Sequence, residues 1–172
     1  MKTKNVRINL VVLALIILGI STRFFIDIPN FTAIGAIALF SGAFFTNRKL
    51  AFTLPIALLL ITDIFLGFHN TMLFVYIPFM LLILIGFLLK QSTKPLHILA
   101  ASIAGSVIFF IISNFGVWIT GMGISPTLIG VYTDGLPFFR NTLASDLIFN
   151  AIFFTSVYFV FEKTSLLKTV NE

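Results

Sequence analysis

The sequence lacks cysteine and has very few charged side chains. None of its 172 residues is cysteine, and only 10% are charged, whereas 59% are hydrophobic. A disulfide-stabilised scaffold is therefore excluded, and disorder is excluded because disordered chains have low hydrophobicity. A soluble domain would need more polar side chains to cover its surface, since about a quarter of the residues in such domains are charged. The composition instead favours a protein embedded in a lipid bilayer.

Apolar segments separated by short polar breaks run along the whole chain. Six are expected to be membrane spans: Ile8–Ile20, Phe31–Phe45, Leu50–Leu66, Thr71–Leu89, Ile98–Ile119 and Thr142–Phe161. None alternates apolar and polar residues, so a transmembrane barrel is disfavoured. Helices are expected because they satisfy every backbone group internally. The sequence thus predicts an all-α integral membrane protein, with residues 1–172 forming one bundle of six transmembrane helices.

The positively charged residues predict how this bundle is oriented. With six spans, nine of the 11 Lys and Arg residues fall on the side of the termini: Lys2, Lys4, Arg7, Arg48, Lys49, Lys90, Lys94, Lys163 and Lys168. Arg23 and Arg140 fall on the other side. Loops rich in Lys and Arg stay in the cytoplasm, so both termini are expected there. The same distribution explains the net charge of +5 without a nucleic-acid partner.

The first apolar segment has a second interpretation. Met1–Ile20 resembles a signal peptide, with a basic start followed by a short apolar run. An Ala-x-Ala-like cleavage site is missing, which favours a retained helix, but both interpretations stay open.

Polar residues collect in the outer half of the predicted bundle. A charge inside a span costs about 2.5–3.5 kcal/mol, so Asp63 and Asp146 require a reason to be there. Asn150 follows Asp146 by four residues, and Trp118 follows Asn114 by four, so each pair shares a helix face. We expect these residues to line a cavity open to the outside, with His69, Tyr132 and Asn141 as further candidates. The predicted substrate-binding residues are Asn30, Asp63, Asn114, Trp118, Arg140, Asp146 and Asn150.

Structural roles are an alternative for each of these residues. Asn141 is a candidate N-cap of the sixth span, and Asp146 is favoured by the nearby helix dipole and by pairing with Arg140. Asp63 can reach the lipid headgroups, and Trp118 can belong to an aromatic belt.

Small residues recur at helical spacing in two spans. Gly35, Ala38 and Gly42 lie along the second, and Ala100 and Ala104 lie along the fifth. Such stripes let helix backbones approach closely. They predict either packing within the chain or a docking surface for another membrane subunit.

The longest break runs from Thr120 to Asn141. Its glycines and prolines, interspersed with apolar residues, predict a bent flap over the outer face. An irregular connector at the interface is the alternative.

Catalytic and metal-binding patterns are weak. A P-loop is missing, and Gly123-Ile124-Ser125 matches an intramembrane serine-protease motif only superficially. Asp63 and Asp146 lack the Gly-x-Gly-Asp context of an aspartyl dyad. His69 and His97 fall on opposite sides of the membrane, so we expect them to share no metal ion, and no cofactor is expected. We predict that the protein is not an enzyme.

Three segments resemble a known group of proteins: IPNFTAIGAIALFSGAFF at residues 28–45, NFGVW at 114–118 and LPFFRNTLASD at 136–146. They are similar to a group of small bacterial membrane proteins near the substrate-binding S components of energy-coupling-factor vitamin transporters. The resemblance covers roughly residues 23–161. It implies a bacterial inner-membrane protein that captures a micronutrient and works with a transmembrane coupling subunit and cytoplasmic ATPases. S components often dock through Ala-xxx-Ala in their first span, whereas here Ala14 is followed by Leu18.

We therefore expect a substrate-capture subunit of a vitamin-type uptake system. A structural subunit of a cell-shape complex, similar to the MreD family, is the alternative, and an intramembrane hydrolase is a third. The structural alternative would make the polar cluster internal packing and the small-residue stripes an interface.

Overall fold

The fold consists of six α-helices in the part of the chain that the structure describes. This computed structural model describes residues 2–89 and 94–157, and the side chains of residues 10–89 and 94–156. The helices are α1 (Lys2–Phe25), α2 (Ile34–Phe44), α3 (Arg48–Leu66), α4 (Met72–Leu89), α5 (Pro95–Ile119) and α6 (Leu128–Val157). The predicted end of the sixth span at Phe161, together with Lys90, Lys163, Lys168, Glu162 and Glu172, lies outside the described residues.

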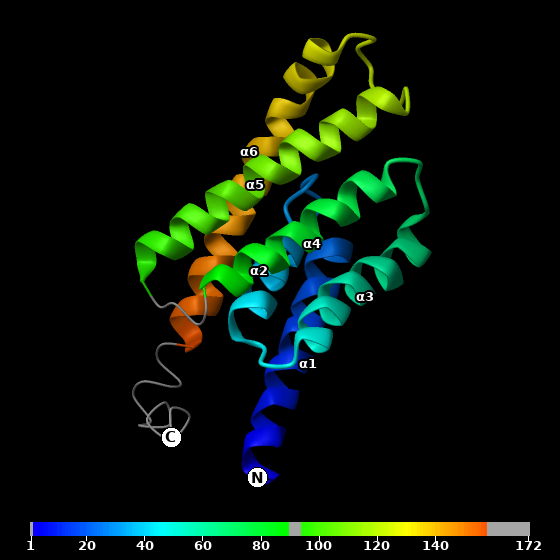
Figure 1. The fold of residues 1–172 in the computed structure, drawn as a ribbon. Coiled ribbons are helices and arrows are strands. Elements are labelled where there is room, and N and C mark those ends of the chain that lie inside the picture. The colour runs from blue at the N-terminus through cyan, green and yellow to red at the C-terminus, as the bar shows by residue number, and fades with distance from the viewer. Residues whose placement is uncertain (1, 90–93, 158–172) are drawn as a thin grey trace.

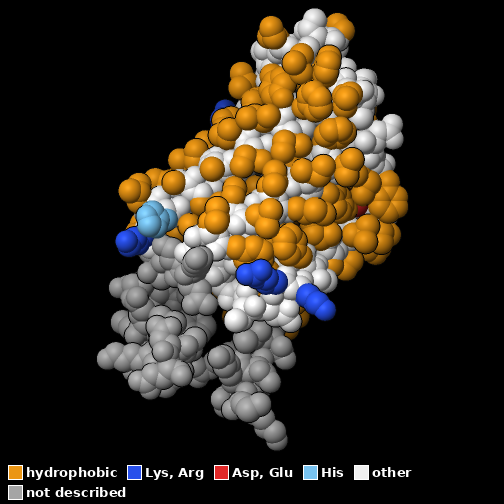
Figure 2. All heavy atoms as spheres, in the orientation of Figure 1, with side chains coloured by type: hydrophobic (Ala, Val, Ile, Leu, Met, Phe, Trp, Pro, Cys, Tyr) orange, Lys and Arg blue, Asp and Glu red, His pale blue; other side chains and the backbone are white. Residues whose placement is uncertain are grey.

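Consecutive helices run up and down, so α1 begins and α6 ends at the same end of the bundle (Figure 1). The starts of α3 and α5 lie at this end too. Arg48, Lys49 and Lys94 are exposed there, and Figure 2 shows Lys and Arg side chains below a large apolar surface. We call this end the basic end. The α5–α6 hairpin extends past the α3–α4 hairpin at the opposite end (Figure 1).

The short helix α2 occupies the centre of the bundle. It contacts each of the other five helices, and every residue from Ile34 to Ala43 is buried. Gly42 faces Gly86 of α4 so closely that a Cβ on Gly42 would lie 2.9 Å from the Gly86 Cα. Small residues in α2 thus allow its backbone to touch that of α4, as small-residue stripes do in membrane helices.

Three helices, rather than the predicted six, are long and apolar enough to cross a membrane. They are α3, α4 and α5 within the described residues. The apolar part of α1, from Leu10 to Phe25, is shorter, and α2 has only 11 residues. Helix α6 has 30 residues, but Arg140, Asp146 and other polar residues interrupt its apolar sequence. Helix α2 falls short because it is a buried central helix, and α6 because it carries polar residues on its interior face.

The predicted flap is wrong over most of its length, because α6 begins at Leu128. Residues 128–141 are helical, Pro137 lies inside the helix, and Asn141 is therefore not an N-cap. Packing on α5 explains the helix: the Tyr132 hydroxyl donates to the Ile111 carbonyl over 2.7 Å, and Gly135 fits against the Asn114 side chain. These contacts outweigh the weak helix propensity of glycine and proline.

Candidate functional site

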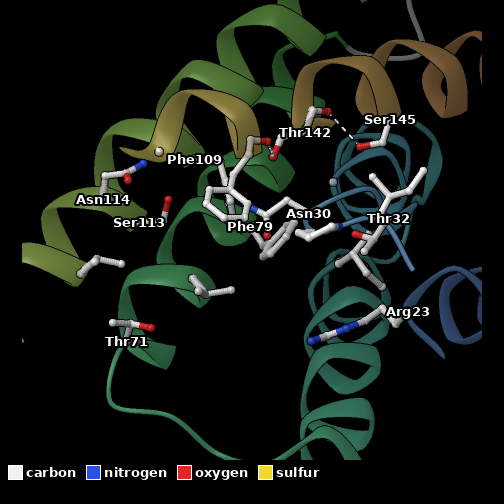
Figure 3. Close-up of a pocket in the computed structure, with 18 of the residues that line it drawn as sticks. Arg23, Asn30, Thr32, Thr71, Phe79, Phe109, Ser113, Asn114, Thr142 and Ser145 are labelled. Carbon is white, nitrogen blue, oxygen red and sulfur yellow. Dashed lines mark hydrogen bonds between the residues drawn. The ribbon is translucent and has the colours of Figure 1, made fainter. Parts of the chain in front are cut away.

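A cavity of about 640 Å³ lies at the end of the bundle opposite the basic end. Residues from all six helices line it, together with the α1–α2 connection at residues 26–33. Figure 3 shows Asn114 and Ser113 on one side and Arg23 on the other, with Phe79, Phe109 and Asn30 between them. Because α2 begins only at Ile34, the space above its N-terminus is left open for this cavity.

Asp146 forms the deep, polar part of the cavity wall. It is only 3% exposed, and the Ser106 hydroxyl lies 2.7 Å from its Oδ2. Gly35 makes room for this carboxyl group, because a Cβ on Gly35 would overlap Oδ1 of Asp146. The N-terminus of α2 favours a negative charge there by up to about 2 kcal/mol. Burying a charge without a charged partner costs several kcal/mol, so the dipole alone does not offset the burial of an ionised Asp146.

A line of buried polar groups continues from Asp146 between α5 and α6. Asn150 Nδ2 donates to the Ser102 hydroxyl over 2.9 Å, and Ser102 donates to the Ile98 carbonyl over 2.8 Å. Asn150 is 2% exposed, and its Oδ1 has no hydrogen-bond partner among the described residues. We call Ser102, Ser106, Asp146 and Asn150 the α5–α6 polar cluster.

A second buried cluster connects α1, α3 and α4. Arg23 donates to Asp63 over 2.7 Å, and the Tyr76 hydroxyl donates to the other Asp63 oxygen over 2.8 Å. Asp63 is 2% exposed and does not line the cavity, whereas Arg23 does. We call Arg23, Asp63 and Tyr76 the Arg23 cluster. It gives the buried charge of Asp63 a charged partner and a hydrogen-bond donor.

The remaining polar groups lie nearer the opening. Asp27 and Asp134 are exposed lining residues, and the Ser125 hydroxyl donates to Asp134 over 2.6 Å. His69 is hydrogen-bonded to Thr71 at 2.7 Å. Even without Asp146, the lining holds two exposed carboxyl groups against the one guanidinium of Arg23, which is already paired with Asp63. The charge of the lining therefore favours a positively charged ligand.

Aromatic rings and one amide complete the lining. Phe79 and Phe109 pack against each other with ring centroids 5.3 Å apart, and Phe138 lines the cavity from α6. Asn114 Nδ2 donates to the Phe110 carbonyl over 2.8 Å, which fixes the orientation of its amide beside Gly135. Such a mixture of apolar walls and a few oriented polar groups is typical of small-molecule sites.

The structure brings together three of the seven predicted substrate-binding residues. Asn30, Asn114 and Asp146 line the cavity. Asp63 and Asn150 are buried behind it, each bonded to a neighbouring helix. Arg140 is exposed on α6 and is not a lining residue, so Ser106 and not Arg140 is the residue bonded to Asp146.

Trp118 is not among the residues that line the cavity. It borders an adjoining, smaller hollow of about 340 Å³, and Gly123 and Ile124 line both spaces. The i, i+4 spacing predicts that Trp118 and Asn114 share a helix face, but it does not indicate which of the two faces the cavity.

Sequence reasoning missed Arg23, Asp27, Asp134 and Ser106 as parts of the site. A signal for Arg23 was available, because a carboxylate buried in a span requires a partner and Arg23 is one of only two outer cations. Ser106 gave no such signal, since serine is common in apolar helices.

The small residues predicted to dock a partner separate into two groups. Gly35, Ala38 and Gly42 are buried inside the chain, where they adjoin Asp146 and α4. Ala100 and Ala104 are exposed on α5. Only the second pair is accessible to a partner in this structure.

The described residues contain no group of three or more His, Asp or Glu side chains placed to hold a metal ion. Their arrangement suits binding, through a buried carboxyl group, a fixed amide and aromatic faces.

Comparison with known proteins identifies the family. The family of unknown function DUF6580 matches residues 3–168. The chain belongs to this family. The matched range includes every residue that lines the cavity and all of the six helices except Lys2. Neither a curated protein nor a solved structure matches the chain.

Proposed function

We propose that this DUF6580 protein is a membrane-embedded capture subunit for a small, positively charged micronutrient. The cavity carries the proposal. Its volume of about 640 Å³ falls within the range of about 300–1,000 Å³ found for small-molecule sites. Residues from all six helices contribute to it.

The proposed topology has six membrane-embedded helices with both termini in the cytoplasm. The exposed cations Arg48, Lys49 and Lys94 at the basic end support it, since such residues remain on the cytoplasmic side. The cavity at the other end then opens outward, where a nutrient arrives. Helix α2 needs no lipid-spanning length in this arrangement, because its neighbours surround it.

The lining suggests how a ligand would be held. Asp146 would accept hydrogen bonds from an ammonium group, and Asn114 would orient a polar group at the other side. Phe79 and Phe109 would contact an apolar or aromatic body. The ligand would reach Asp146 through the space above α2.

Energy for uptake would come from other subunits. The chain lacks a P-loop, and the resemblance to S components suggests a transmembrane coupling subunit and cytoplasmic ATPases in the bacterial inner membrane. The exposed pair Ala100 and Ala104 is the surface we assign to the coupling subunit, because small residues permit close helix contact.

A thermal-shift screen of the purified protein tests the capture proposal. Vitamins and their precursors, with emphasis on amines, would be tested on wild type, Asn114→Ala and Arg140→Gln. We expect one ligand class to raise the melting temperature of wild type and of Arg140→Gln, and to do so much less for Asn114→Ala. The absence of stabilisation by any ligand, or an equal effect on all three proteins, would contradict the proposal.

Co-purification tests the partners. Recovery of an ATPase complex that Ala104→Leu disrupts supports the assigned surface. Recovery of cell-wall assembly proteins instead would favour a structural subunit of the cell envelope.

A further inference from the structure

Asp146 is buried without a charged partner among the described residues. Its neighbours come from α2 and α5. Helix α2 contains no titratable side chain, and His97, the one in α5, lies in the first turn of that helix, far from Ser106. Across the cavity the titratable or charged lining residues are Arg23, Asp27, His69 and Asp134, and Arg23 is bonded to Asp63. An ionised Asp146 would therefore have the Ser106 hydroxyl as its hydrogen-bond donor and no cation to balance its charge.

The hydrogen bonds around Ser106 indicate where a proton lies. Its oxygen is 2.7 Å from Asp146 Oδ2 and 3.1 Å from the Ser102 carbonyl oxygen. A hydroxyl has one hydrogen, so Ser106 cannot donate to both acceptors at once. If Asp146 carries a proton on Oδ2, it donates to Ser106, and Ser106 donates to Ser102. The Ser106–Asp146 and Ser106–Ser102 contacts are then both hydrogen bonds.

We infer that Asp146 is protonated while the cavity is empty, and that the ammonium group of a ligand replaces this proton. On binding, the O–H bond of Asp146 breaks, the proton leaves through the cavity to water, and an N–H group of the ligand donates to the carboxylate. One positive charge replaces another, so the buried site stays neutral throughout. The N-terminus of α2 beside Gly35 helps to hold the carboxylate once it is ionised.

This inference deepens the proposed function, because it assigns a cationic ligand and an exchanged proton to the same cavity. Its first half does not depend on any ligand. Infrared spectroscopy of the full-length protein in detergent detects the carbonyl stretch of a protonated carboxylic acid. We expect this band at neutral pH in wild type and in Asp134→Asn, which alters an exposed lining carboxyl group, and its loss in Asp146→Asn. A wild-type spectrum without a band sensitive to Asp146→Asn would overturn the inference.

Thermal stability gives a second measurement. An asparagine resembles a neutral aspartic acid, so Asp146→Asn is expected to melt at or above the wild-type temperature at neutral pH. Wild type should lose stability in alkaline buffer, where Asp146 is forced to ionise, and the difference between the two proteins should grow. A variant less stable than wild type whose deficit grows in alkaline buffer would overturn the inference, because it would show that the ionised form is the stabilising one.

The exchange of the Asp146 proton for an ammonium group is tested by infrared spectroscopy in methylammonium chloride and in sodium chloride at equal concentration. Loss of the acid band with methylammonium alone supports the exchange. Loss with both salts overturns the assignment of an ammonium group, and loss with neither overturns the exchange itself. A protein that shows the band and exchanges methylammonium, yet is stabilised by no vitamin or precursor, would count against the capture proposal and not against this inference.

Discussion

Asp63 and Asp146 are buried to the same extent but have opposite surroundings. Asp63 is bonded to the Arg23 guanidinium and to the Tyr76 hydroxyl, behind the cavity wall. Asp146 faces the cavity and is bonded to the neutral Ser106 hydroxyl. Nη1 of the Arg23 guanidinium has no hydrogen-bond partner among the described residues. Both oxygens of Asp63, however, are engaged by Arg23 and Tyr76, so this carboxylate ties three helices together and leaves no oxygen free for a ligand. Asp146 has no charged partner and faces the cavity, so it is available to a ligand. We therefore assign a structural role to Asp63 and a binding role to Asp146.

Replacing each aspartate by asparagine should give the largest difference in stability between the two sites. Asp63→Asn leaves the guanidinium of Arg23 without its charged partner, and breaking a buried pair in this way costs about 3–5 kcal/mol. Asp146→Asn should cost little. Melting curves in detergent measure the difference, and Arg23→Gln added to Asp63→Asn should restore part of the loss. Equal losses for the two single variants would remove the distinction.

Removing the hydroxyl beside each aspartate is a milder version of the same comparison. Tyr76→Phe deletes a hydrogen bond to a charged group and should cost about 1.5–3 kcal/mol. Ser106→Ala deletes a hydrogen bond between neutral groups and should cost about 0.5–1.5 kcal/mol. The ratio of the two losses in thermal melts reports the charge state of each carboxyl group. A larger loss for Ser106→Ala would indicate an ionised Asp146.

Gly35→Ala should act on one cluster only. The added Cβ displaces the Asp146 carboxyl group, and overpacking of this kind costs about 1–3 kcal/mol. Combined with Asp146→Ala, which vacates the space, the penalty should shrink. Combined with Tyr76→Phe in the Arg23 cluster, the effects should add within about 0.5 kcal/mol. Additivity in both double variants would show that Gly35 and Asp146 do not depend on each other.

The smallest effects are expected outside both clusters. Arg140→Gln changes an exposed residue, and Trp118→Phe changes a residue of the smaller adjoining hollow. Each should change stability by less than about 0.5 kcal/mol and leave ligand stabilisation in the thermal-shift assay as in wild type. Loss of stabilisation in Trp118→Phe would mean that the ligand extends beyond the main cavity.

The difference between Asp63 and Asp146 was only partly predictable. Sequence indicated that both lie in apolar helices and that each requires a reason for its burial. It assigned both to one site, because depth along a span can be estimated from sequence while rotation about the helix axis relative to neighbours cannot. Arg140 was a reasonable partner for Asp146 on the assumption that a loop ended at Asn141. The helix that begins at Leu128 instead carries Arg140 on an exposed face.

The amino-acid sequence alone determined the helical and apolar character of this DUF6580 protein. These properties follow from composition and from order along the chain, and they are local. Only the tertiary structure decided that α2 is central, that α6 extends to Leu128, and which polar groups share a cavity. Those outcomes depend on close packing between helices distant in sequence. Gly35, for example, leaves room for the Asp146 side chain, and Gly135 leaves room for the Asn114 side chain. The sequence around each glycine does not indicate which side chain will pack against it.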